Sequence, residues 1–84
     1  MTPILYSLQK CIKCDLAESY LHIDYEKHVF PKDFSQWTDK QKEIAKEVID
    51  DLAITAPVLV VNGTHYVGVL AIKKFMEEKC QNLK

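Results

Sequence analysis

The sequence predicts one α/β domain in which a four-stranded mixed sheet is flanked by three helices. Three observations carry this prediction: short apolar runs of strand length, an Asn62-Gly63 pair between two of those runs, and apolar residues that recur at helical spacing in three other segments. The expected order of elements is β-α-β-α-β-β-α. A β-α-β crossover followed by a hairpin gives a sheet with parallel and antiparallel neighbours, whose faces the helices cover.

The first strand and the first helix surround a pair of cysteines. Residues 3–8 are mostly apolar and partly aromatic, which predicts a strand buried on at least one face. The first helix is expected to begin at the cysteines and to run from Cys14 to about His22. Its buried face is defined by Cys14, Ala17 and Leu21, which recur at helical spacing. The cysteines therefore lie where a strand ends and a helix begins.

The second strand and the second helix follow. Residues 25–30 mix aromatic, Val and charged residues and stop before Pro31, as an edge strand does. Thr38-Asp39-Lys40-Gln41 has the form of a capping box, in which the Thr and Gln side chains satisfy free backbone amides, and Trp37 is expected to pack beside this cap. The capping box predicts a single second helix, whose apolar stripe consists of Ile44, Val48, Ile49 and Leu52.

A hairpin and a third helix complete the domain. Val58–Val61 and Thr64–Val67 are separated by Asn62-Gly63, the sequence typical of a two-residue hairpin turn. The third and fourth strands are therefore expected to be antiparallel neighbours. The third helix follows Gly68, and its apolar side is expected to consist of Val69, Ile72, Phe75, Met76, Cys80 and Leu83.

Length and charge limit the classes of function. The 84 residues suffice for one domain, residues 1–84, and a hydrophobic content of 48% is that of a folded chain. With 11 basic and 12 acidic residues, the net charge of -1 gives no reason to expect binding to nucleic acid or to a membrane. Residues 1–3 place no basic stretch ahead of an apolar segment, and no apolar run reaches the length needed to span a bilayer, so we expect neither a leader segment nor a membrane span. We therefore expect a cytoplasmic monomer that acts on proteins or small molecules.

Two of the three cysteines, Cys11 and Cys14, form a C-x-x-C pair, which in a cytoplasmic chain indicates redox or metal chemistry. The free amides and the dipole at a helix start stabilise negative charge on Cys11, and Lys10 and Lys13 add positive charge beside it. Cys11 is therefore expected to ionise readily and to attack a substrate disulfide. Cys14, one turn further in, is expected to be shielded and close enough to resolve the mixed disulfide on Cys11.

The other cysteine and the histidines suggest no further site. A structural zinc site needs four nitrogen or sulfur ligands, and the sequence contains neither a second C-x-x-C pair nor two closely spaced histidines. No metal site is therefore predicted, and His22, His28 and His65 are scattered along the chain. Cys80 is expected to be a small buried residue of the third helix without a redox role.

Four short motifs together resemble those of the glutaredoxins, over the whole chain and in the usual order. They are Cys11-Ile12-Lys13-Cys14, Thr55-Ala56-Pro57-Val58, Val61-Asn62-Gly63-Thr64 and Val67-Gly68. The resemblance implies a thioredoxin-like fold with a cis peptide bond before Pro57, beside the active disulfide. Only about 5–6% of X–Pro bonds in folded proteins are cis, and the residues alone also fit a Pro57 that simply begins a strand.

The resemblance also implies the function. The chain would be a thiol–disulfide oxidoreductase that reduces protein or glutathione mixed disulfides, carrying out electron transport through a redox-active disulfide between Cys11 and Cys14. Glutathione would be a co-substrate, with no tightly bound cofactor. The backbone of Ala56 would pair with an extended partner chain, as in strand addition. The residues implied in binding the substrate or glutathione are Lys10, Thr55, Ala56, Pro57, Gly68 and Val69.

The chain departs from the glutaredoxin pattern in two places. Glutaredoxins usually carry two glycines and an acidic residue where this chain has Val67 to Ala71, and often a lysine where it has Leu8. A related branch, which reduces ribonucleotide reductase and is itself reduced by thioredoxin reductase, has a proline loop similar to Ala56-Pro57-Val58. Resemblance to that branch would imply ribonucleotide reductase as the substrate and thioredoxin reductase as the electron source, so glutathione and thioredoxin reductase both stay open as the reductant. Two other classes stay open: an iron–sulfur module in which two chains use Cys11, and a domain that binds a partner without turnover.

Overall fold

The computed structural model describes residues 2–82, except for the side chains of residues 53, 54 and 80–82. Along this part of the chain the elements are β1 (Ile4–Leu8), α1 (Ile12–Tyr20), β2 (Glu26–Phe30), a 3-10 helix (Phe34–Gln36), α2 (Asp39–Ile44), α3 (Ile49–Ile54), β3 (Val58–Val61), β4 (Thr64–Val67) and α4 (Val69–Asn82). The predicted strands and the first and last helices are present within one or two residues of their expected bounds.

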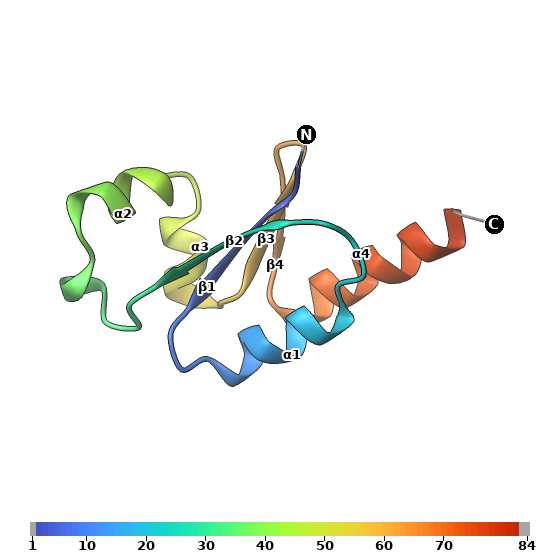
Figure 1. Ribbon diagram of the computed structural model, residues 1–84, viewed down its shortest axis with the longest axis horizontal. Coiled ribbons are helices and arrows are strands. Elements are labelled where there is room, and N and C mark those ends of the chain that lie inside the picture. The colour runs from blue at the N-terminus through green and yellow to red at the C-terminus, as the bar shows by residue number, and fades with distance from the viewer. Residues whose placement is uncertain (1, 83–84) are drawn as a thin grey trace.

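The four strands found in the described residues form one mixed sheet in the order β2-β1-β3-β4. β1 is parallel to β2 and antiparallel to β3, and β3 is antiparallel to β4. This confirms the predicted mixed sheet and the position of β2 at its edge. Figure 1 shows the sheet between two layers, with α1 and α4 on one face and α2 and α3 on the other.

The core has two halves because side chains alternate between the faces of a sheet. Leu5 and Tyr6 are neighbours in β1, yet they belong to different halves. The half beneath α1 and α4 consists of Leu5, Ala17, Leu21, Leu59, Ile72 and Met76. The half beneath α2 and α3 consists of Tyr6, Phe30, Trp37, Ala45, Val48, Leu52 and Val58. The buried face predicted for the first helix, Cys14, Ala17 and Leu21, is confirmed.

The hairpin between β3 and β4 forms as predicted. Asn62 and Gly63 have φ angles of 50° and 84°, the two positive values that a type I′ turn requires. The turn pairs Val61 with Thr64 and fixes the register of both strands. β4 consequently ends beside the start of β3, where α4 begins.

The prediction of a single second helix is wrong, because the segment forms two short helices joined by a turn. The capping box at Thr38 is present and starts α2. Hydrogen bonds then change to i→i−3 spacing, with Lys46 N bonding Glu43 O at 3.3 Å and Val48 N bonding Ala45 O at 2.9 Å. Apolar residues three apart fit both an α-helix and this tighter turn, and the segment has no Gly or Pro to mark the change.

The break also changes which residues of this segment are buried. Ala45, Val48 and Leu52 are buried, whereas Ile44, expected on the buried stripe, is 38% exposed. Ala45 occupies the position that the pattern assigned to Ile44.

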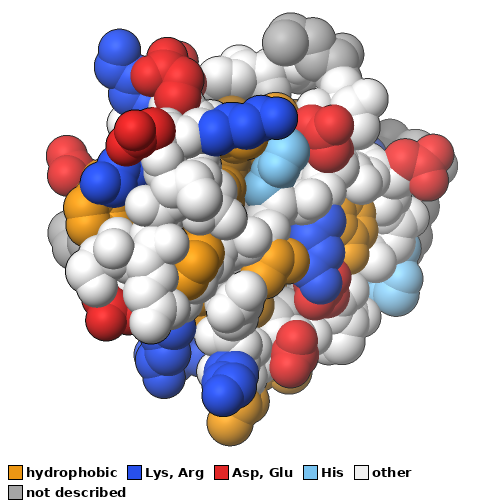
Figure 2. All heavy atoms as spheres, turned by 60° about the vertical axis from the view of Figure 1, so that its left-hand side comes forward, with side chains coloured by type: hydrophobic (Ala, Val, Ile, Leu, Met, Phe, Trp, Pro, Cys, Tyr) orange, Lys and Arg blue, Asp and Glu red, His pale blue; other side chains and the backbone are white. Residues whose placement is uncertain are grey.

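Charged side chains of both signs are interspersed over the face shown in Figure 2, which agrees with the net charge of -1. Within residues 2–82, no helix has the length and apolar content needed to cross a bilayer.

Candidate active site

Cys11 lies at the junction of β1 and α1. The chain leaves β1 through Gln9 and Lys10, and Lys10 has a φ of 52°. Cys11 follows as the N-cap of α1, and its Sγ atom accepts a hydrogen bond from the backbone N–H of Cys14 at 3.1 Å. Amides that point at the sulfur stabilise negative charge on it. Cys11 is therefore at the helix start, as the sequence predicted.

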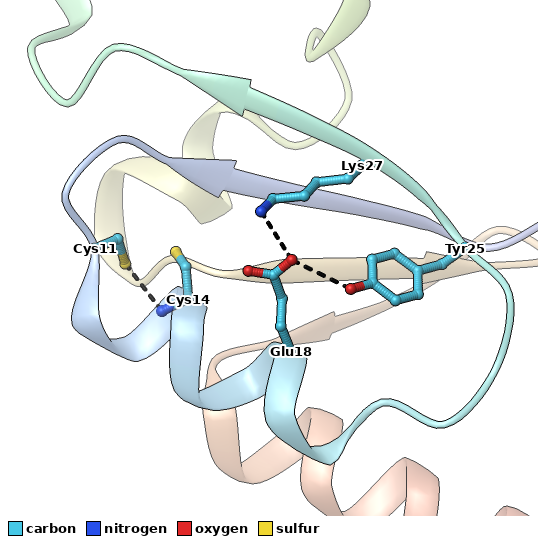
Figure 3. Close-up of polar contacts among 5 residues, drawn as sticks. All are labelled: Cys11, Cys14, Glu18, Tyr25 and Lys27. Carbon is cyan, nitrogen blue, oxygen red and sulfur yellow. Dashed lines mark hydrogen bonds and ion pairs between the residues drawn. The ribbon is translucent and has the colours of Figure 1, made fainter.

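Cys14 lies in the first turn of α1 and is only 2% exposed. Burial, and to a smaller extent the hydrogen bond with Cys11, raises the pKa of its thiol to about 11. The backbone of Leu8 and the hydroxyl of Ser7 act in the opposite direction. Both cysteines are free thiols, and Figure 3 shows the two sulfur atoms at the same end of α1. At neutral pH Cys14 is therefore a shielded, neutral thiol beside the more exposed Cys11.

A polar contact fixes the direction of α1 against β2. Glu18 Oε1 accepts a hydrogen bond from the Tyr25 hydroxyl at 3.2 Å and lies 2.8 Å from Lys27 Nζ (Figure 3). The bond to Glu18 raises the pKa of Lys27. The pair is partly exposed, so it contributes more to orientation than to stability.

The Ala56–Pro57 peptide bond is cis, as the resemblance implied. Pro57 is fully buried, and its carbonyl accepts a hydrogen bond from Gly68 N–H at 2.8 Å. Gly68 has a φ of +90°, and a Cβ at this position would lie 3.2 Å from Thr55 Cγ2. The loop of residues 55–57 is thus packed closely against the start of α4.

The loop after β2 is held by Trp37. Its indole N–H donates to the Pro31 carbonyl at 2.6 Å, and its ring stacks on Phe30 at 4.6 Å between centroids. The Phe34 ring lies 5.2 Å away on the same indole. Trp37 is buried, which confirms the prediction that it packs beside the cap. This packing places Lys32 and Phe34 at the edge of the sheet that carries Cys11.

A groove of about 650 Å³ opens at Cys11. It brings together four of the predicted site residues, and it adds others that the sequence did not indicate. Its lining residues are Leu8, Gln9, Lys10, Cys11, Ile12, Lys13, Lys32, Phe34, Leu52, Thr55 and Ala56. One signal was present for Lys32 and Phe34: β1 and β2 are parallel, so the loops that follow them meet at the same edge of the sheet.

A second groove, of about 460 Å³, lies on the other side of Thr55. It contains Gly68 and Val69, which do not line the first groove. Its lining residues are Lys13, Leu16, Thr55, Val67, Gly68, Val69 and Leu70. Leu70 is 80% exposed and Leu16 is 46% exposed, so this groove offers apolar surface to a partner. Thr55 and Lys13 line both grooves and join them into one surface.

The surface around Cys11 is positively charged. Lys10, Lys13 and Lys32 are exposed and line the first groove. Among the described residues that line either groove, none is acidic. The arrangement favours anionic groups next to the cysteine.

Two predictions for the last helix fall on residues or side chains that the structure does not describe. The burial predicted for Cys80 lies outside the described side chains, and Leu83 lies outside the described residues. In the described part of the chain, no three His, Cys, Asp or Glu side chains are grouped as metal ligands would be.

Comparison with known proteins identifies the fold. No protein-family model matches the sequence, and no curated protein matches it. Among solved structures, a glutaredoxin from Archaeoglobus fulgidus matches with a TM-score of 0.60 and 20% identity, covering 79% of this chain and 73% of its own. Glutaredoxin 1 from Francisella tularensis, solved in complex with cacodylate, matches with a TM-score of 0.65 and 12% identity, covering 95% and 96%. The chain therefore has the fold of the glutaredoxins, a thioredoxin-like α/β fold.

Proposed function

We propose that the chain is a glutaredoxin-type thiol–disulfide oxidoreductase that works through a Cys11/Cys14 dithiol–disulfide cycle. The observation that carries the proposal is the difference between the two sulfurs. Cys11 caps a helix and lines an open groove, and Cys14 is buried one turn further along the same helix. The glutaredoxin fold of the chain agrees with this chemistry.

The cycle needs two exchange steps. The Cys11 thiolate attacks one sulfur of a substrate disulfide, forming a mixed disulfide and releasing the other sulfur as a thiolate, which takes up a proton. Cys14 then loses its proton and attacks Cys11, forming the Cys11–Cys14 disulfide and releasing the second substrate thiol. The substrate is reduced by two electrons and the protein is oxidised by two. Two external thiols, or one dithiol, then reduce the Cys11–Cys14 disulfide by two successive exchanges and are themselves oxidised to a disulfide.

The two grooves support a protein disulfide as the substrate. The loop of Thr55, Ala56 and Pro57 offers backbone groups that can pair with an extended substrate segment. Such pairing does not depend on the side chains of the substrate. The lysines suit carboxylates, and the exposed Leu16 and Leu70 suit apolar side chains. A protein disulfide in an extended segment satisfies these features together.

Glutathione is the smaller alternative substrate and a source of electrons. Its carboxylates fit the lysines, and it has no apolar side chain for the second groove. Thioredoxin reductase is the other electron source to be tested, with ribonucleotide reductase as a protein substrate. We place the reaction in the cytoplasm, where reduced thiols predominate.

The test is NADPH oxidation coupled in parallel through glutathione with glutathione reductase and through thioredoxin reductase. A disulfide-bearing protein serves as substrate, and Cys11→Ser serves as the inactive control. We expect turnover with one of the two systems and none with the variant. Absence of turnover with both, from a protein that forms its disulfide reversibly, would contradict the proposal.

A further inference from the structure

Ser7 is a buried polar residue of β1 on the face of the sheet that α1 covers. It lies in β1 opposite Val29 of β2, and it points to the same face of the sheet as Leu5, two residues earlier. Leu5 packs in the core half that contains Ala17 of α1. Cys14 precedes Ala17 by one helical turn, so Ser7 and Cys14 meet between β1 and α1 in the same way that Leu5 and Ala17 do.

The hydroxyl of Ser7 is unsatisfied in the dithiol form. Ser7 is 2% exposed, and its Oγ atom has no hydrogen-bond partner among the described residues. A buried hydroxyl without a partner costs free energy, and a neutral thiol is a weak acceptor. A thiolate is a strong hydrogen-bond acceptor. The Ser7 hydroxyl favours the thiolate form of Cys14, because it lowers the pKa of that thiol.

We propose that Ser7 is a positioning residue whose hydroxyl donates a hydrogen bond to the Cys14 sulfur whenever that sulfur carries negative charge. The proposal rests on the Cys11/Cys14 cycle of the proposed function. Two neutral groups of β1, the Ser7 hydroxyl and the Leu8 backbone, stabilise the charge, and Cys11 is the titratable neighbour that opposes it. The donor is already in place, so no group has to reorganise when the charge forms.

Negative charge appears on Cys14 at two points of the cycle. In closure, Cys14 loses its proton and attacks Cys11, the bond between Cys11 and the substrate sulfur breaks, and the substrate leaves as a thiolate that is then protonated. In opening, an external thiolate attacks Cys11, and Cys14 leaves as a thiolate. A hydrogen bond enlarges the reactive fraction in the first case and improves the leaving group in the second.

The size of the effect can be anticipated. Loss of one hydrogen bond to a charged group lowers the thiolate fraction about tenfold. The thiolate that remains is more basic and more nucleophilic by about threefold. The Ser7→Ala variant should therefore close its mixed disulfide about threefold more slowly at neutral pH, and it should open more slowly by a similar factor.

Closure can be measured with a small aromatic disulfide, dithiobis(nitrobenzoate), whose released thiol is coloured. Mixing with the reduced chain gives a phase whose rate is independent of reagent concentration, because Cys14 displaces the second coloured thiol from Cys11. This phase is absent in Cys14→Ser, which assigns it. Opening is followed by the reaction of the oxidised chain with dithiothreitol.

Two control variants and a stability measurement separate positioning from a structural role. Ser19→Ala makes the same change on the exposed side of α1, where the hydroxyl bonds Leu16 O, and it should leave both rates unchanged. Ser7→Thr keeps a hydroxyl and should restore closure. Ser7→Ala should keep or raise the Tm, because it removes an unsatisfied buried group.

The outcomes are distinct. Slower closure and opening at an unchanged or higher Tm support the role of Ser7. Equal rates in Ser7→Ala and the unsubstituted chain overturn it while leaving the oxidoreductase function intact. Absence of the Cys14-dependent phase in the unsubstituted chain overturns the cycle itself, and with it the proposed function.

Discussion

The two cysteines are three residues apart, yet the fold gives them different environments. Cys11 is half-buried at the cap, with a backbone N–H on its sulfur, whereas Cys14 is 2% exposed against β1. The helical position of both residues could be predicted from the sequence, because the strand before them and the apolar spacing after them fix the start of α1. The environment of Cys14 then follows from its place on the buried face.

The difference predicts which cysteine holds a trapped partner. Cys14→Ser should leave attack by Cys11 intact and accumulate a mixed disulfide, because the group that resolves it has been removed. In Cys11→Ser, an adduct on Cys14 should form much more slowly than the adduct on Cys11 forms in Cys14→Ser, since Cys14 is shielded and neutral. Mass spectrometry after exposure to oxidised glutathione measures both, with Cys80→Ser as the control. An adduct that forms on Cys14 of the Cys11→Ser protein as fast as on Cys11 would reverse the assignment.

The thiol of Cys14 also predicts how stability depends on pH. Its pKa is raised from 9.0 to about 11 in the folded chain, chiefly by burial. The unfolded chain therefore loses this proton first, so the stabilisation is complete below pH 9 and is lost as pH rises through 11. The free energy of unfolding should fall by roughly 2 kcal/mol across this window.

Urea unfolding under reducing conditions, at pH values across that window, measures the loss. The pKa values of Tyr6, Tyr25 and Lys27 are also raised in the folded chain, so their ionisation likewise lowers the free energy of unfolding as pH rises. Cys14→Ser is therefore the reference, because only the thiol contribution is missing from it. Identical pH dependence in the two proteins would show that the Cys14 thiol ionises equally in both states.

Two residue-level features could not be predicted from local pattern. The cis bond at Ala56–Pro57 is a minority conformation that the residues alone do not specify. Phe34 lies at the groove through its stacking on Trp37, a tertiary contact without a local sequence motif, whereas Lys32 reaches the groove because the loops after the parallel strands β1 and β2 meet at the same edge of the sheet.

At the scale of elements, the hairpin was predictable and the break between α2 and α3 was not. A type I′ turn requires positive φ angles at both central residues, which Asn62 and Gly63 adopt readily. These two residues therefore predict the turn and with it the pairing of the two strands that it joins. Residues 45–48 contain no such signal, and their apolar spacing fits a helix as well as a turn. Local pattern determines an element only where it excludes the alternatives.

The junction of β4 and α4 predicts a matched pair of glycine substitutions. Gly63 and Gly68 have φ angles of +84° and +90°, so Ala at either position is strained by about 1 kcal/mol. A Cβ at position 63 meets nothing within 4 Å, whereas one at position 68 lies 3.2 Å from Thr55 Cγ2. Gly68→Ala should therefore cost more stability and should also displace Thr55, raising KM for a disulfide substrate.

Chemical denaturation gives the two stability losses, and steady-state kinetics gives the two KM values. Gly63→Ala should keep the KM of the unsubstituted chain, because its turn lines neither groove. Equal KM values in the two variants would mean that the contact between Gly68 and Thr55 does not position the loop.

At the scale of the whole molecule, the numbers of acidic and basic residues nearly balance, but the charges are unevenly distributed over the surface. The net charge is -1, and acidic and basic side chains are interspersed over the face in Figure 2. Lys10, Lys13 and Lys32 nevertheless surround the groove at Cys11, and no described lining residue opposes them. The net charge alone gives no reason to expect a charged partner, and it cannot show this local concentration, which arises when the loops after β1 and β2 meet.

This local charge predicts that the attack of Cys11 depends on ionic strength in a way that the substrate determines. Raising the ionic strength from about 0.01 M to about 0.15 M shortens the screening length from about 30 Å to about 8 Å. The rate with dithiobis(nitrobenzoate), which carries two carboxylates, should fall about threefold, because the lysines no longer concentrate the anion. The rate with the uncharged dithiodipyridine should change little.

Lys32→Gln should reduce the salt dependence with the anionic reagent, whereas Lys46→Gln, at an exposed lysine that lines neither groove, should preserve it. Stopped-flow absorbance measures each rate under pseudo-first-order conditions. If both reagents show the same salt dependence, or if the two lysine variants behave alike, the groove does not select anions and its lysines do not serve to bind carboxylates.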